Sequence, residues 1–120
     1  MGKNQRKGAI FEWEAAEYAT KKTGDEVIPR RAQGTNDKGD LFGLKCRGKR
    51  VTAECKNCRQ MSLADWIEQA EIERGNDDGE YGIVIHKRKG KGSKHFGENY
   101  VTMTYDTFLA ICVGGHDLLQ

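Results

Sequence analysis

The sequence predicts an α/β domain with the element order helix, three strands, helix, two strands, helix. Residues 9–23 show the 3.6-residue period of a helix, and Gly24 is typical of a helix C-terminus. Residues 50–57 alternate with the period of two that characterises a strand. Residues 80–86 are apolar enough for a central strand. A helix at 63–74 ahead of that strand is typical of a right-handed crossover to a parallel strand.

Two further strands are expected between the first helix and the alternating strand. They cover residues 25–31 and residues 40–46. The segment Arg47-Gly48-Lys49 separates the second of them from the alternating strand and has the composition of a tight turn. The sequence therefore predicts a hairpin formed by residues 40–46 and 50–57.

The second half of the chain is predicted to contain two helices and two strands. Ser62 is the expected N-cap of the helix at 63–74. A strand at 99–104 and a short helix at 106–113 follow the central strand. The apolar stripe of the longer helix consists of Leu63, Trp66, Ile67 and Ala70.

Length indicates a single domain, residues 1–120, and its separated basic blocks suit contact with a polyanion, with ordinary solvated surface as the alternative. A chain of 120 residues can bury a modest core. No apolar run approaches the roughly 20 residues of a membrane span. No apolar signal segment follows the basic N-terminal arm at 1–8, so we expect a cytoplasmic protein, in the host cytoplasm if phage-encoded. A mobile basic loop is expected at 87–98, where its cations would contact phosphates; they are Lys87, Arg88, Lys89, Lys91 and Lys94.

Asp40, Glu54 and Lys56 have the most informative spacing in the chain. Glu54 and Lys56 share one face of the alternating strand, whereas Cys55 points to the apolar face. Asp40 opens the preceding strand, so the hairpin can bring its carboxylate beside that of Glu54. Two carboxylates at strand ends suit Mg²⁺, and a nearby lysine can orient or deprotonate an attacking water. A Glu-x-Lys on a solvated sheet occurs by chance in many domains, but the aspartate at hairpin distance favours phosphodiester hydrolysis.

Glu12 is a further candidate because of its helical phase. At about 100° per residue it falls within the apolar arc of the first helix, whereas Glu14 and Glu17 lie on the polar side. A carboxylate on a packing face is costly unless it is paired, hydrogen-bonded or bound to a metal. Glu12 is therefore predicted to reach the metal site, with a structural ion pair as the alternative and Glu14 as the second choice for the role.

These motifs resemble those of the PD-(D/E)XK nucleases, the restriction-endonuclease-like superfamily. The sequence Asp40…Glu54-Cys55-Lys56 is similar to their catalytic signature, although Gly39 stands where the name of the superfamily places proline. Residues 6–12, a basic-glycine element followed by glutamate, and the basic loop at 30–35 are similar to those of archaeal and phage Holliday-junction resolvases. The resemblance covers roughly residues 3 to 112.

The resemblance implies a restriction-endonuclease-like core, with a central mixed β-sheet flanked by helices. It implies that Asp40, Glu54 and the backbone carbonyl of Cys55 bind Mg²⁺, for which Mn²⁺ can substitute. Lys56 would position water, and Glu12 would assist. Arg31 and Thr35 would contact the scissile phosphate. The expected DNA-binding set also includes Lys3, Arg6, Lys7 and Arg30.

The predicted activity is that of a Mg²⁺-dependent Holliday-junction resolvase, which cuts branched double-stranded DNA in recombination and repair. Because resolution needs paired cuts, we expect a homodimer. A nicking or restriction-type endonuclease is the alternative within this class. The alternative outside it is a non-catalytic nucleic-acid-binding module on the same fold.

The four cysteines predict neither zinc nor disulfides. Cys55-x-x-Cys58 lacks the second ligand pair of a zinc site, and disulfides are rare in cytosolic chains. We expect Cys46 and Cys112 to be small buried hydrophobic residues.

Overall fold

The computed structural model describes residues 2–30 and 36–120. The expectations for Arg31 and Thr35 lie outside the described residues, as does the side chain of Lys3. The predicted α/β class is confirmed. A four-stranded mixed sheet has the order β3 (Lys45–Cys46), β4 (Lys49–Lys56), β5 (Tyr81–His86) and β6 (Tyr100–Thr102). β4 and β5 run parallel, and the other two pairings are antiparallel.

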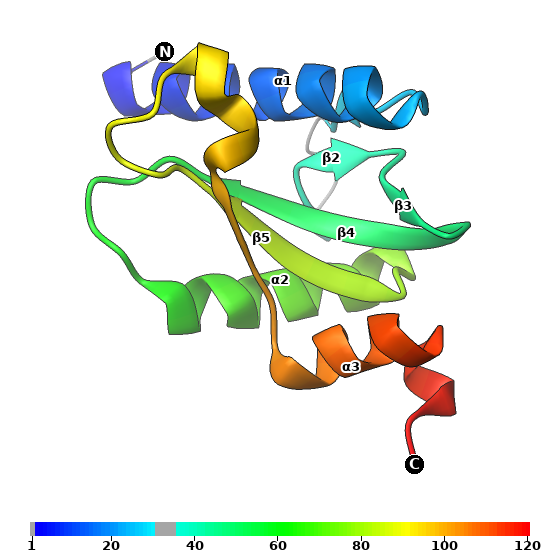
Figure 1. Cartoon of the computed structure of the whole chain (residues 1–120). Helices are drawn as coiled ribbons and strands as arrows, with labels where there is room; N and C mark the ends of the chain where they lie inside the picture. The colour runs from blue at the N-terminus through cyan, green and yellow to red at the C-terminus, as the bar shows by residue number, and fades with distance from the viewer. Residues whose placement is uncertain (1, 31–35) are drawn as a thin grey trace.

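Helices cover both faces of this sheet (Figure 1). α1 (Lys3–Thr23) lies over the face that carries the apolar residues Val51, Ala53 and Cys55. α2 (Leu63–Asp77) lies over the opposite face, where Trp66 and Val84 form a smaller cluster. The predicted alternation of β4 is therefore confirmed. The polar face of β4 is not solvated, because α2 covers it.

The C-terminal part of the chain contains α3 (Tyr105–Val113), which packs against β5, and the 3₁₀ turn η2 (His116–Leu118). Before β6, the 3₁₀ helix η1 (Ser93–Glu98) contacts α1 (Figure 1). The expected basic loop at 87–98 thus contains a short helix. None of the helices in the described part of the chain is both long and apolar enough to span a membrane.

Several element boundaries differ from the prediction. α1 begins at Lys3, so most of the expected basic arm at 1–8 is helical. Of the described residues in the strand expected at 25–31, Ile28–Pro29 form β1, which pairs with β2 (Leu41–Phe42).

The strand expected at 40–46 breaks into β2 and β3 at Gly43. The φ of Gly43 is 106°, and a Cβ there would lie 2.2 Å from the carbonyl oxygen of Glu26. Only glycine tolerates this left-handed conformation and close approach. The chain therefore turns at Gly43 and leaves only two residues of β3 to pair with β4.

The helix ends follow the sequence signals in part. Gly24 has a φ of 83° and donates its N–H to the carbonyl of Thr20, a left-handed cap. Ser62 is the N-cap residue of α2, but its hydroxyl contacts the carboxylate of Asp65 at 3.0 Å and makes no backbone cap bond. α2 continues to Asp77, one turn beyond the predicted end.

The cysteines are free, and the described residues contain no disulfide. Cys55 is buried and Cys46 is half-buried at the margin of the core. The prediction that Cys112 is buried is wrong. Cys112 lies on α3 with its side chain exposed. Cys58, in the loop after β4, is also exposed.

Asp77 ties three segments together at the end of α2. Its Oδ1 accepts a hydrogen bond from Arg30 Nη2 at 3.0 Å, and its Oδ2 accepts one from the hydroxyl of Thr52 at 2.8 Å. Arg50 Nη1 donates to the Asp77 carbonyl oxygen at 2.7 Å. The Asp77 carboxylate is buried, with 1% of its side chain exposed. This network holds the segment after β1 against β4 and α2.

We predict that Asp77→Ala destabilises the fold by about 3 kcal/mol, because it leaves Arg30 and the Thr52 hydroxyl without their buried partner. Chemical denaturation measures the change. The exposed Asp25 supplies the control, and Asp25→Ala should change the unfolding free energy by less than about 0.5 kcal/mol. Equal stability of the two variants would contradict a structural role for the network.

Candidate active site

The site lies along the edge of β4 that β3 leaves unpaired. Asp40 fills this edge: its N–H donates to the carbonyl of Ala53 at 2.8 Å, and its Oδ2 accepts the N–H of Cys55 at 2.7 Å. The Asp40 carboxylate is thus fixed beside the second half of β4. Both hydrogen bonds use backbone groups that a longer β3 would have occupied.

Gly39 has a structural reason to be glycine. Its φ is 89°, and a Cβ there would lie 3.0 Å from the Ala53 carbonyl oxygen and 3.1 Å from Thr52 Cγ2. Proline is restricted to a φ of about −65° and could not adopt this conformation. Glycine at this position therefore allows the turn that delivers Asp40 to the β4 edge.

Glu54 and Lys56 project from the face of β4 that α2 covers. Glu54 is buried, and its Oε2 lies 3.1 Å from Lys56 Nζ. Its Oε1 is buried without a hydrogen-bond partner among the described residues. Burial alone would lower the pKa of Lys56, but the adjacent Glu54 carboxylate raises it above its ordinary value. Lys56 therefore remains an ammonium group and a hydrogen-bond donor.

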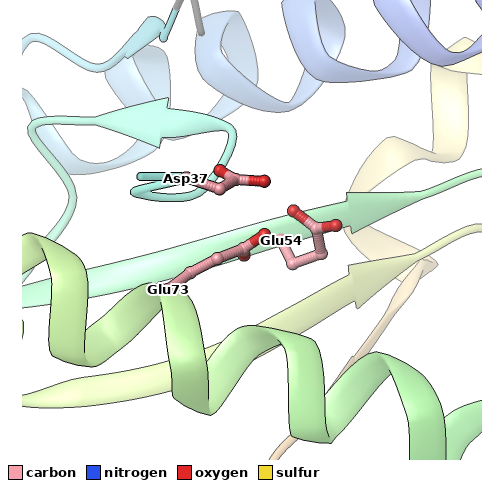
Figure 2. Close-up of side chains that lie close together, drawn as sticks. All are labelled: Asp37, Glu54 and Glu73. Atoms are coloured by element: carbon pink, nitrogen blue, oxygen red, sulfur yellow. The ribbon is translucent and has the colours of Figure 1, made fainter. Parts of the chain in front are cut away.

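Two acidic residues that the sequence analysis missed complete the site. Carboxylate oxygens of Asp37, Glu54 and Glu73 lie within 4.8 Å of one another. Figure 2 shows them pointing toward a common point from the loop before β2, from β4 and from α2. Glu73 is buried; its Oε2 accepts from Gln69 Nε2 at 3.1 Å, and its Oε1 is another buried oxygen without a partner in the described ranges.

Helical phase could have identified Glu73. The predicted stripe of α2 included Trp66 and Ala70, and continuing it by three and seven positions from Ala70 gives Glu73 and Asp77. Both are buried in the structure. Asp37 gives no such signal, because it lies in an irregular loop and its side chain is positioned through Gly39, whose N–H it accepts at 2.9 Å.

Glu12 and Asp40 line the same hollow, whereas Glu14 does not contribute to its described lining. Burial, followed by the charge of Asp40 and a hydrogen bond to it, raises the pKa of Glu12 to about 7. Glu14 instead accepts a hydrogen bond from Ser93, outside the acidic cluster formed by Asp37, Asp40, Glu54 and Glu73. The structure thus places Glu12, rather than Glu14, in the acidic cluster.

Burial is the largest cause of the raised pKa values in this cluster, and the proximity of like charges adds to it. Burial, together with the neighbouring Glu54 carboxylate, raises the pKa of Asp40. Burial and the neighbouring carboxylates of Asp37 and Glu54 raise the pKa of Glu73. A cation bound among these groups would relieve the repulsion and supply partners for the two free oxygens.

The donor set fits a hard divalent cation. Such cations prefer oxygen ligands, and carboxylates supply them here. The Cys55 thiol lies in the core, where burial raises its pKa. Cys55 could therefore contribute only through its backbone. A hollow of about 700 Å³ opens beside the cluster and is lined partly by Glu12, Asp37 and Asp40.

The predicted DNA-binding cations have different surroundings. Arg30 is engaged by Asp77 and stacks on Phe42, with 5.0 Å from its guanidinium carbon to the ring centroid. Its first role is thus structural. The side chains of Arg6, Lys7, Lys89 and Lys94 are exposed. Lys91 and Arg88 lie 3.2 and 3.6 Å from Glu98, and Lys87 is half-buried. Exposed ion pairs of this kind are weak and compatible with phosphate contacts.

Comparisons with protein-family models, curated proteins and solved structures find no match for this chain. The geometry of the site and its sequence motifs are accordingly the basis for assigning a function.

The raised pKa values predict a specific pH dependence of stability. Folding raises the pKa values of Glu12, Asp40 and Glu73 and so favours their protonated forms. Their contribution to the stability of the fold is therefore complete below their ordinary pKa values. It is lost as pH rises through the folded values. Without divalent cations, the melting temperature should fall between pH 5 and pH 8 by on the order of 5 °C. Added Mg²⁺ should oppose the fall.

Thermal melts in EDTA across this pH range provide the measurement. Glu73→Gln should flatten the profile, whereas Glu68→Gln, which alters an exposed residue of the same helix, should leave it unchanged. A parent melting temperature that rises toward pH 8 in EDTA would contradict the repulsion described above.

Proposed function

We propose that this protein is a Mg²⁺-dependent, structure-selective DNA endonuclease with a restriction-endonuclease-like core. The observation that carries the proposal is the convergence of the Asp40 and Glu54 carboxylates beside the Lys56 ammonium group at the open edge of β4. These are the residues of the PD-(D/E)XK-like signature, and they meet although 13 residues lie between Asp40 and Glu54 in the chain.

The acidic residues would hold the cation. Asp40 and Glu54 would be ligands, with the Cys55 carbonyl and Glu12 assisting, and Glu73 and Asp37 extend the oxygen-rich wall. Mg²⁺ or Mn²⁺ bound there supplies positive charge that attracts the scissile phosphate and offsets the charge developing during hydrolysis. The unpartnered oxygens of Glu54 and Glu73 are consistent with a ligand role.

Lys56 would orient the attacking water. Its raised pKa keeps it protonated, so it donates hydrogen bonds and does not serve as the base. Its contact with Glu54 fixes the ammonium group next to the cation-binding oxygens. The attacking water would lose its proton to solvent or to a carboxylate of the cluster.

Branched DNA is the proposed substrate, and Holliday-junction resolution is the proposed task. Exposed cations on α1 and on the segment after β5 supply sequence-independent phosphate contacts, notably Arg6, Lys7, Lys89 and Lys94. A homodimer would present two sites for the paired cuts. Incubation with a four-way junction and a matched linear duplex, each with Mg²⁺ or EDTA, tests this. We expect cutting of the junction alone, and only with Mg²⁺; efficient cutting in EDTA would refute the mechanism.

Removing any one of the three central groups should separate chemistry from binding. Asp40→Asn, Glu54→Gln and Lys56→Ala should each reduce junction cleavage by about 10²-fold or more, because a cation ligand or the water-orienting donor is lost. Junction affinity in Ca²⁺ should remain close to that of the parent. Glu17→Gln, an exposed change on α1, is the control and should cut normally. Parental cleavage by Glu54→Gln would contradict the assignment.

Glu12 and Glu14 form a matched pair for testing the helix register. Glu12→Gln should reduce cleavage by at least about tenfold with the fold intact, because Glu12 lies beside Asp40. Glu14→Gln should cut normally, since Glu14 contacts Ser93. Melting temperatures measured on both variants separate catalysis from stability. A defective Glu14 variant beside an active Glu12 variant would overturn the assignment.

A further inference from the structure

A second hollow adjoins the acidic cluster through Lys56. It has a volume of about 370 Å³ and lies where the parallel strands β4 and β5 both end. Lys56 lines this hollow while its ammonium group contacts Glu54. In α/β sheets, ligands bind preferentially outside the carboxyl ends of parallel strands. A volume near 370 Å³ is also within the roughly 300–1,000 Å³ of ordinary ligand pockets.

The hollow is strongly cationic. Its lining contains Lys56, Arg59, Lys87, Arg88 and Lys89, and no aspartate or glutamate of residues 2–30 and 36–120 contributes to it. The neighbouring cluster is acidic, so the two halves of this surface carry opposite charge. An anionic chain that places one phosphate at the cation site would thus find favourable charge for its next phosphate in the second hollow.

Aromatic rings form the wall of the hollow between these cations. The ring centroids of Trp66 and Tyr100 each lie 5.7 Å from that of His86. Tyr100 is 46% exposed, and the Arg88 guanidinium carbon lies 5.6 Å from its ring centroid. Exposed aromatic faces flanked by cations are the platform on which proteins stack the bases of single strands.

His86 adds a polar group to this wall. It is 4% exposed, and its Nε2 lies 2.7 Å from the Thr102 hydroxyl. Its Nδ1 has no hydrogen-bond partner in the described part of the chain. Buried polar atoms are nearly always paired, so an unpaired ring nitrogen at a hollow indicates a missing polar partner. The edge of a nucleobase supplies both donors and acceptors.

We propose that this hollow receives an unpaired nucleobase from the DNA strand whose scissile phosphate lies at the acidic cluster. A base within an intact duplex is stacked and paired and cannot enter. A bulged base enters without the cost of breaking a pair, and a base at a branch point enters at a lower cost than one inside a regular duplex because its stacking is interrupted. The inference rests on the proposed function and deepens it, because it assigns the preference for branched DNA to Tyr100, Arg88 and their neighbours.

The test is binding of three fluorescein-labelled duplexes by anisotropy in EDTA, where no cleavage occurs. One is fully paired, one contains a single bulged thymidine, and one carries an abasic residue at the bulge. The parent protein should bind the bulged thymidine about tenfold more tightly than the abasic analogue, equivalent to about 1.4 kcal/mol. Tyr100→Ala should abolish this preference, and Tyr100→Phe should retain it.

Tyr105→Ala is the matched control, because Tyr105 is 75% exposed on α3 and does not line the hollow. It should keep the tenfold preference. Equal parental affinity for the thymidine and abasic bulges would overturn the inference, as would a folded Tyr100→Ala variant that still discriminates.

Trp66 fluorescence gives a second measurement of base binding in which no residue lining the hollow is substituted. In a Trp13→Phe background, the bulged thymidine should quench Trp66 more than the abasic analogue does, and equal quenching would count against the inference. Because these binding assays require no cation, base recognition in EDTA combined with no junction cleavage in Mg²⁺ would refute the nuclease and leave the hollow's base-binding role intact. Cleavage in Mg²⁺ without base recognition would refute the base-binding role of the hollow and leave the nuclease proposal intact.

Discussion

The packing of α2 against the polar face of β4 is the constraint on which the site depends. It removes Glu54 and Glu73 from water while leaving one oxygen of each without a partner in the described chain. Charged groups in that position are expensive unless something compensates them. Lys56 partly compensates the charge of Glu54. The raised pKa values of Glu12, Asp40 and Glu73 favour the protonated, uncharged forms of these residues in the folded protein. A divalent cation is the compensation that the oxygen-rich geometry fits best.

The short β3 strand is the second requirement. Because Gly43 turns the chain after β2, β3 pairs only with the first residues of β4, and the rest of that edge is open. Asp40 then binds the free backbone at Ala53 and Cys55. A longer, more regular hairpin would have been a better strand pair and would have excluded the aspartate. The irregularity of the hairpin is thus part of what positions Asp40.

Strong periodicity is what made parts of this molecule predictable. The α/β class, the two faces of β4 and the inward phase of Glu12 all follow from side-chain spacing. The breaks around Gly43 depend on a contact with Glu26 that adjacent residues do not reveal. Glu73 was missed although its helical phase marked it, because the predicted stripe of the helix was traced only through its apolar residues, as far as Ala70. Asp37 was unpredictable, since loop geometry alone brings it to Glu54 and Glu73.

Cation binding in the absence of DNA tests the central claim most directly. A calorimetric titration of the metal-free protein with Mn²⁺ at pH 7.5 should show saturable binding that Mg²⁺ competes away. Asp40→Asn should weaken it by at least about tenfold, the equivalent of 1.4 kcal/mol, while Asp25→Asn should not change it. If Mn²⁺ does not bind, or binds the Asp40 variant as tightly as the parent, the carboxylates are not a cation site and the account is wrong.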